Sequence, residues 1–160
     1  MKCLIPLSVV TLLLSSCAIQ QHIPTEKAQI LQVSGQSQGQ IYNKSRQWFS
    51  SYFVSGESVI DYEDPGSGTI IGKGIANVGG DALGIIQNKI HYTLRVDTKS
   101  GRMRVTTKII KHTNTDSQRT YDVSHVSPTR VTKADQHLQG VVRNLENYVK
   151  SKSGSSSTNW

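Results

Sequence analysis

The sequence predicts an α+β fold in which an antiparallel sheet of four to five strands carries two helices on one face. Three observations support this prediction. Apolar residues recur at helical spacing near both ends of the folded part, they alternate with polar residues over residues 90–96 and 103–109, and short glycine-containing turns join neighbouring strands. Two amphipathic helices can cover one sheet face, which leaves the other face open to solvent.

The first 17 residues have the features of a bacterial lipoprotein signal. An apolar run from Leu4 to Leu14 follows a short basic start, and Leu14, Ser15, Ser16 and Cys17 resemble the lipobox at which such signals are cleaved. The run is too short to span a bilayer, which takes about 20 apolar residues. We therefore expect residues 1–16 to be a signal peptide and the thiol of Cys17 to carry a covalent lipid. No other cofactor is expected.

This signal also predicts a location in the cell envelope. Acyl chains contribute about 0.8 kcal/mol per buried methylene and would hold Cys17 at a membrane surface. Ala18 follows the cysteine at a position where aspartate can signal retention in the inner membrane. We therefore expect a lipid anchor in the outer membrane and a domain that faces the periplasm. Neither cysteine is then available for a disulfide, because Cys3 lies in the cleaved peptide and the sulfur of Cys17 carries the lipid.

Residues 17–39 are predicted to be a lipidated tether, because they are rich in Gln and Ser and show little periodicity. An edge strand at Ile30, Leu31 and Val33 is the alternative for part of this segment. At the other end, residues 151–160 are mostly Ser, Gly, Thr and Asn, a composition that predicts a disordered tail. The folded domain is therefore expected over residues 40–150.

The domain is predicted to begin with an amphipathic helix and to continue with a hairpin. Apolar residues of the helix share one face at helical spacing, and that face comprises Ile41, Ser45, Trp48, Phe49 and Tyr52. Strands at residues 58–64 and 69–77 follow, joined by a turn at residues 65–68. The second strand has a face of small residues that could let a helix approach closely, namely Ile70, Gly72, Gly74 and Ala76.

A second hairpin and a closing helix complete the predicted domain. After a loop at residues 78–88, the two alternating segments are joined by a turn at Ser100 and Gly101. Tyr121 and Val123 mark a shorter strand. The closing helix is expected after Ser127 and Pro128, with Thr132 as its candidate cap. Its apolar stripe comprises Leu138, Val141, Val142, Leu145, Tyr148 and Val149.

Residues 40–110 resemble the DUF4468 family, which consists of small exported bacterial domains described as having a TBP-like fold. The resemblance rests on the first helix, the first hairpin and the end of the third strand, through Ile41, Tyr42, Trp48, Asp64, Gly68, Ile70, Gly72, Lys73, Gly74, Gly101, Arg102, Met103 and Arg104. It implies that fold and an envelope setting. The family carries no agreed function or catalytic residues, so the resemblance implies no site.

Basic residues gather on the predicted open face of the sheet. The chain has a formal net charge of +7, which predicts attraction to anionic partners. Strand alternation places five cations outward on the second hairpin, and they form a candidate anion-binding face: Arg95, Lys99, Arg102, Arg104 and Lys108. The alternative is a solvated surface that only discourages aggregation.

Motifs for catalysis and metal binding are weak. Residues 35–39 match the G-x-S-x-G pattern of a hydrolase nucleophile, but a serine such as Ser37 before a helix is ordinary capping chemistry. The five histidines lack metal-ligand spacing, so no metal site is expected. We therefore expect a non-catalytic binding or accessory module. Its expected partners are the membrane, through the anchor, and an anionic envelope component or acidic protein, but not nucleic acid. A small periplasmic hydrolase is the alternative.

Overall fold

A computed structural model describes residues 24–53, 60–80, 83, 86–115, 119–122 and 126–151. The predicted signal peptide with Leu14, Ser15 and Ser16, the lipidation site Cys17, strand residue Val123 and the tail from residue 152 onward lie outside the described residues.

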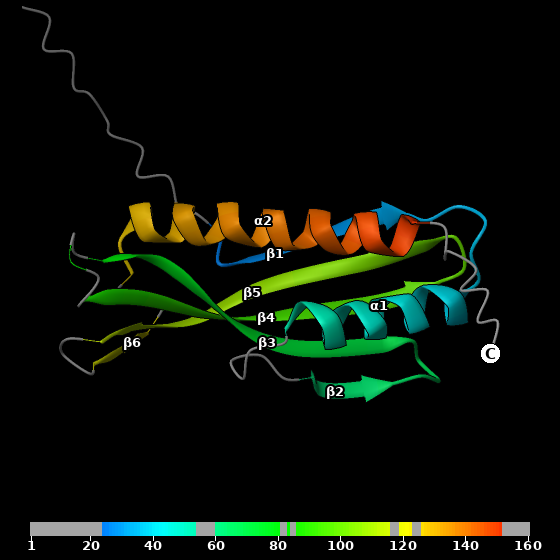
Figure 1. Cartoon of the computed structure of the whole chain (residues 1–160), viewed down its shortest axis with the longest axis horizontal. Helices are drawn as coiled ribbons and strands as arrows, with labels where there is room; N and C mark the ends of the chain where they lie inside the picture. The colour runs from blue at the N-terminus through cyan, green and yellow to red at the C-terminus, as the bar shows by residue number, and fades with distance from the viewer. Residues whose placement is uncertain are drawn as a thin grey trace, which may run out of the picture.

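In the described part of the chain, one antiparallel sheet carries two helices on one face (Figure 1). The strands stand in the order β1-β5-β4-β3-β2, and β6 pairs with the part of β5 that β1 does not cover. The α+β prediction is therefore confirmed, with a six-stranded sheet in place of four to five strands. The elements are β1 (Glu26–Gln32), α1 (Gln38–Tyr52), β2 (Ile60–Asp64), β3 (Thr69–Gly80), β4 (Gln87–Lys99), β5 (Arg102–Asn114), β6 (Thr120–Asp122) and α2 (Pro128–Lys150).

Strand β1 lies within the segment that the sequence analysis assigned to the tether. It pairs with β5 from Glu26 opposite Lys108 to Gln32 opposite Arg102, so it begins earlier than the suggested edge strand. Edge position explains the weak sequence signal, since most β1 side chains are exposed and the apolar alternation is therefore incomplete. The folded part thus reaches into residues 17–39.

Helix α1 begins at a capping box and buries the face that the sequence predicts. Ser37 accepts a hydrogen bond from the Gln40 backbone N–H, and the Gln40 side chain accepts one from the Ser37 N–H. Ile41, Ser45, Trp48 and Phe49 are buried as predicted; Tyr42 is buried as well, whereas Tyr52 is exposed.

Helix α2 begins directly after Ser127, so its N-cap lies earlier than the predicted Thr132, and the helix packs beside α1. Its N-cap is Ser127, and Pro128 occupies the first turn, where a missing N–H costs nothing. Thr132, the predicted cap, lies inside the helix and its hydroxyl donates to the Pro128 carbonyl. The predicted apolar stripe is buried except for Tyr148, which is exposed.

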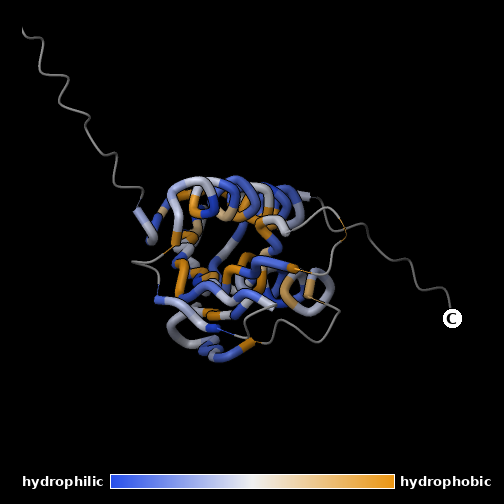
Figure 2. The backbone as a smooth tube through the Cα atoms, turned by 90° about the vertical axis from the view of Figure 1, so that its left-hand side faces the viewer, coloured by the Kyte–Doolittle hydropathy of each residue, from blue (hydrophilic) through white to orange (hydrophobic). Residues whose placement is uncertain are grey.

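A single core lies between the two helices and the sheet, where hydrophobic residues gather in the end-on view of Figure 2. Trp48 of α1 and Leu145 of α2 are both fully buried in it. The Trp48 Nε1 donates to Asn144 Oδ1 at 2.7 Å, which ties the two helices together. Neither helix, within the described residues, combines the length and apolarity needed to cross a membrane.

The small-residue face of β3 lets α1 approach the sheet, as the sequence suggested. A Cβ atom at Gly72 would lie 2.6 Å from Cε1 of Phe49, far inside van der Waals contact. A Cβ atom at Gly74 would clash in the same way with the ring of Tyr92 on the neighbouring strand. The absence of a side chain at Gly72 is therefore what lets Phe49 pack directly on the sheet.

We expect Gly72→Ala to lower the free energy of unfolding by about 1–3 kcal/mol, because the new methyl group overpacks the core at Phe49. Chemical denaturation measures the change. Gly140→Ala is the matched control: nothing lies within 4 Å of its Cβ position, and it should stabilise helix α2 by about 0.5–1 kcal/mol. A Gly72→Ala chain as stable as the unaltered one would contradict the close packing of α1.

Candidate functional site

The face of the sheet opposite the helices carries all five cations of the predicted anion-binding face. Along β4 and β5 burial alternates, so Val96, Met103 and Val105 point into the core while their neighbours point outward. The outward cations are Arg95, Lys99, Arg102, Arg104 and Lys108. The structure thus brings these residues together as the alternation predicts.

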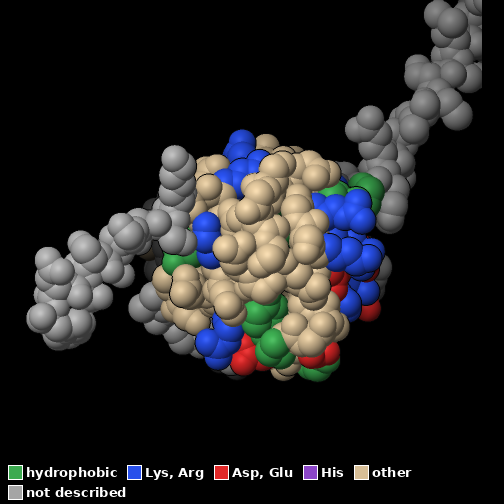
Figure 3. Space-filling view, turned by 90° about the vertical axis from the view of Figure 1, so that its right-hand side faces the viewer, with side chains coloured by type: hydrophobic (Ala, Val, Ile, Leu, Met, Phe, Trp, Pro, Cys, Tyr) green, Lys and Arg blue, Asp and Glu red, His purple; other side chains and the backbone are tan. Residues whose placement is uncertain are grey.

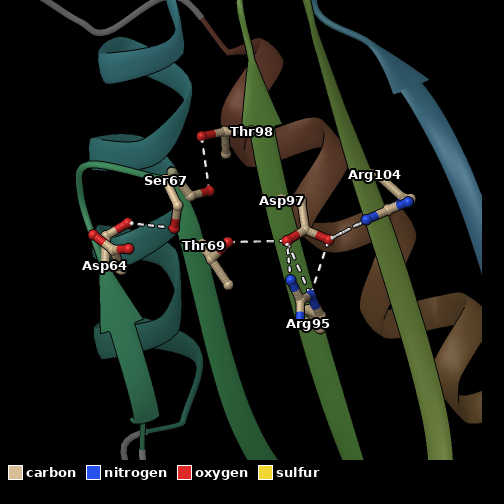
Figure 4. Close-up of polar contacts among 8 residues, drawn as sticks. Asp64, Ser67, Thr69, Arg95, Asp97, Thr98 and Arg104 are labelled. Carbon is tan, nitrogen blue, oxygen red and sulfur yellow. Dashed lines mark hydrogen bonds and ion pairs between the residues drawn. The ribbon is translucent and has the colours of Figure 1, made fainter.

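Asp97 pairs with two of these cations and offsets one of their two charges (Figure 4). The Arg95 Nη2 donates to Asp97 Oδ1 at 2.7 Å, and the Arg104 Nη2 donates to Asp97 Oδ2 at 3.1 Å. The Thr69 hydroxyl donates to the same carboxylate at 3.0 Å. Burial opposes ionisation of Asp97, but these hydrogen bonds outweigh it and hold the pKa of the carboxyl below its ordinary value.

Further carboxylates pair with other cations of the open face. Lys108 lies 3.2 Å from Glu26 of β1, and Lys73 of β3 lies 2.7 Å from Asp61 of β2. The open face is therefore a mixture of ion pairs and is less basic than the sequence alternation alone suggests. Exposed pairs of this kind contribute little to stability, but they reduce the charge that a ligand would meet.

Lys99 and Arg102 differ from the other three cations. They lie directly opposite each other across the β4–β5 ladder, next to the turn that joins the two strands. In the described part of the chain neither has a carboxylate partner. Like charges at directly opposed positions destabilise a strand pair, so this end of the open face carries uncompensated positive charge.

A hollow of about 220 Å³ opens at this end of the face, and we call it the turn hollow. Ile30 of β1 lies beside it with 61% of its surface exposed, and Met103 is buried beneath it. Figure 3 looks onto the end of the molecule that carries the β4–β5 turn, and basic side chains gather along one flank of that end. The lining comprises Ile30, Asp97, Lys99, Arg102, Met103 and Arg104, which is three cations against one carboxylate.

A larger hollow of about 330 Å³ lies between β1 and α2. Its floor includes the buried Val105 and Leu138. Its rim charges are already paired, since Lys27 binds Asp135 at 2.8 Å and Glu26 binds a lysine of β5. This hollow therefore offers no uncompensated charge, in contrast to the turn hollow.

Ser37, His91 and His112, which were considered for other chemistry, make structural contacts, whereas His22 and His125 lie outside the described residues. Ser37 of the G-x-S-x-G match caps α1. His112 is buried and hydrogen-bonds Asn88 at 3.0 Å, and His91 lies 3.0 Å from the hydroxyl of Thr113. Within the described ranges, no group of three or more His, Cys, Asp or Glu side chains is placed to hold a metal ion.

We expect Asp97→Asn to destabilise the fold by about 1–2 kcal/mol at pH 7, because the charged hydrogen bonds to two arginines are lost. The carboxyl pKa is lower in the folded chain than in the unfolded chain, so ionised Asp97 stabilises the fold above the ordinary carboxyl pKa of about 3.9. This contribution is lost as the pH falls through the folded-state pKa. Denaturation from pH 7 to pH 3 should therefore show the two chains converging at the acid end, and a constant difference would contradict the ion-pair role.

The fold is similar to two solved structures. One is a DUF4468 family protein from Bacteroides ovatus, with a TM-score of 0.65 and 18% identity over 79% of this chain and 86% of that chain. The other is a TBP-like protein from Parabacteroides distasonis, with a TM-score of 0.63 and 10% identity over 79% of this chain and 92% of that chain. At such identities the likeness concerns the fold alone.

Among curated proteins, none matches this chain. The family model described as "Domain of unknown function (DUF4468) with TBP-like fold" matches residues 28–113, which include α1, β2 to β4 and most of β1 and β5. Because this match covers more than half of the sequence, the chain belongs to the DUF4468 family.

Proposed function

We propose that the protein is a lipid-anchored lipoprotein of the cell envelope whose domain binds an anionic ligand or partner through the open face of its sheet, without catalysis. The observation that carries this proposal is the uncompensated pair of Lys99 and Arg102 at the turn hollow. Three of the other cations on this face are occupied by Asp97 or Glu26. Among the five cations of the predicted face, Lys99 and Arg102 at the turn hollow are therefore the two that remain open to an external anion in the described part of the chain.

An anion in the turn hollow would relieve the repulsion between Lys99 and Arg102. The guanidinium of Arg102 can present two parallel N–H donors to a carboxylate or phosphate, and the Lys99 ammonium adds a compact charge from the opposite strand. Arg104 is held at the edge of the same hollow by Asp97. A ligand with two or more anionic oxygens fits this arrangement best.

The lipobox supports the membrane anchor. Cys17 precedes β1 by nine residues, and an extended chain spans at most about 3.3–3.6 Å per residue, so the segment allows roughly 30 Å between the anchor and Glu26. We propose attachment to the outer membrane on its periplasmic side, with the covalent lipid on Cys17 and no other cofactor. Nucleic acid is not a proposed partner, because an exported lipoprotein rarely meets it.

The structural role of Ser37 supports a binding module over a small periplasmic hydrolase. Its hydroxyl is engaged at the N-terminus of α1, where it accepts the Gln40 N–H at 3.3 Å. A nucleophilic serine would instead need a neighbouring base within hydrogen-bond reach.

We expect Cys17→Ser to abolish membrane attachment, because the lipid is added to the cysteine sulfur before the signal is cleaved. Fractionation of cells into soluble and membrane material, with mass spectrometry of the peptide that contains residue 17, measures both consequences. The unaltered Cys17 peptide should carry the mass of the lipid. An unmodified Cys17 peptide from membrane-bound protein would refute the anchor.

We expect the double variant Lys99→Gln, Arg102→Gln to weaken binding to dextran sulfate about tenfold at low salt, which corresponds to about 1.4 kcal/mol. The test uses residues 18–160, which contain every helix and strand described. Retention should also weaken as salt rises, because exposed charges are screened over about 10 Å at 0.1 M.

The matched control is Lys133→Gln, Arg143→Gln, which removes the same charges from exposed positions on α2 in the helix layer. This control should keep most of the binding, and both doubles should unfold near the temperature of the parent chain. Equal losses in the two doubles would mean that net charge alone governs retention and that the open face is only a solubility device.

A further inference from the structure

We infer that the open face docks onto the anionic leaflet that holds the lipid anchor, with Ile30 and Tyr62 entering the headgroup layer at its two edges. The inference rests on the proposed function and goes beyond it by naming the partner as a lipid surface. The observations are two exposed apolar side chains, the cations between them and the length of chain that leads to the anchor.

Ile30 and Tyr62 stand at opposite edges of the open face. Ile30 lies on β1 opposite the outward Arg104 and is 61% exposed. Tyr62 lies on β2 opposite Ile71 and is 51% exposed. The next residue of β2, Glu63, binds Arg46 of α1, so Glu63 faces the helix layer and Tyr62 faces the open side.

Ile30 and Tyr62 belong to two neighbouring rows of paired residues that run across the strands of the sheet. One row runs from Ile30 through Arg104 and Asp97. The adjacent row runs from Tyr62 through Ile71 to Arg95. Because strands lie about 4.8 Å apart, the four steps from β1 to β2 separate the two edges by roughly 19 Å. The result is a broad surface with apolar contacts at both edges and cations between them.

A lipid leaflet offers both chemistries that this surface needs. Lipid phosphates can bind Lys99 and Arg102, and the acyl boundary beneath them can receive the aliphatic side chain of Ile30. Tyrosine is enriched at membrane interfaces, where its ring is partly buried while its hydroxyl stays hydrated, and Tyr62 is placed for that role. A soluble polyanion such as dextran sulfate would satisfy the cations alone.

The anchor brings the open face within reach of the same leaflet. Ile30 lies four residues beyond Glu26 along β1, or roughly 13 Å at 3.3 Å per residue. The segment between Cys17 and Glu26 allows roughly 30 Å, which exceeds this distance. Once the lipid is inserted, docking becomes an intramolecular event, so weak contacts are sufficient.

Site-specific fluorescence tests the docking orientation. The chain from residue 18 contains no cysteine, so a single cysteine can carry an environment-sensitive dye. Ala28→Cys places the dye on the open face beside Ile30, and Gln136→Cys places it on the exposed side of α2. Vesicles of phosphatidylcholine, with or without phosphatidylglycerol, are the probes. We expect a blue shift and quenching by lipid-borne quenchers at residue 28 only, and only with phosphatidylglycerol.

A second variant separates docking from simple charge attraction. Tyr62→Ser leaves every cation and the lining of the turn hollow in place and alters one exposed position, and thermal unfolding verifies its fold. We expect it to lower partitioning onto phosphatidylglycerol vesicles about fivefold while leaving retention on dextran sulfate unchanged. Equal partitioning of this variant and the parent, or equal dye shifts at residues 28 and 136, would overturn the docking model.

The two proposals fail in different ways. Retention on dextran sulfate that depends on Lys99 and Arg102, without any dye shift on vesicles, would overturn docking and leave an anionic partner in solution. Loss of specific retention on dextran sulfate would overturn the anion-binding function, and the docking model with it.

Discussion

The pairing of β4 with β5 is the constraint on which the rest of the structure depends. It runs from Asn88 opposite Asn114 to Lys99 opposite Arg102, and Gly101, with φ at 76°, occupies the left-handed conformation that its turn requires. A shift of one residue would send Val96 and its apolar neighbours to solvent and the cations into the core. The register thus decides at once where the helices pack and which charges meet on the open face.

Carboxylates placed by the same register decide how much of that charge remains. Asp97 lies opposite Arg104 and two residues from Arg95, so one carboxylate engages both arginines and offsets one of their two charges. At the turn, Lys99 meets Arg102 instead, and repulsion replaces attraction. The candidate site therefore lies where carboxylates no longer pair with the cations of the open face. It covers only this end of the face.

The sequence predicted the open face because alternation along a strand fixes sidedness without knowledge of tertiary contacts. It could not predict which cations are neutralised, since the Glu26 partner of Lys108 lies on an edge strand whose exposed residues lack a periodic signal. The cap of α2 was misplaced for a local reason: the helix was expected after Ser127 and Pro128, but Thr132 offered an apparent cap one turn later than Ser127. Ile30 became part of the site only through pairing between β1 and β5, which are distant in sequence.

The turn hollow is built on parts of the sheet that are already ordered. The Thr98 hydroxyl and backbone N–H both donate to the Gly68 carbonyl, at 2.9 and 2.8 Å, which ties the β2–β3 turn to β4 behind the site. Asp97 holds Arg104 in place in the same way. Binding would then restrict mainly the side chains of Lys99 and Arg102, at about 0.5–1.5 kcal/mol each. A site with so few charges gains little binding free energy beyond that cost. Under the proposed function, the lipid anchor would supply the local concentration that these contacts alone do not.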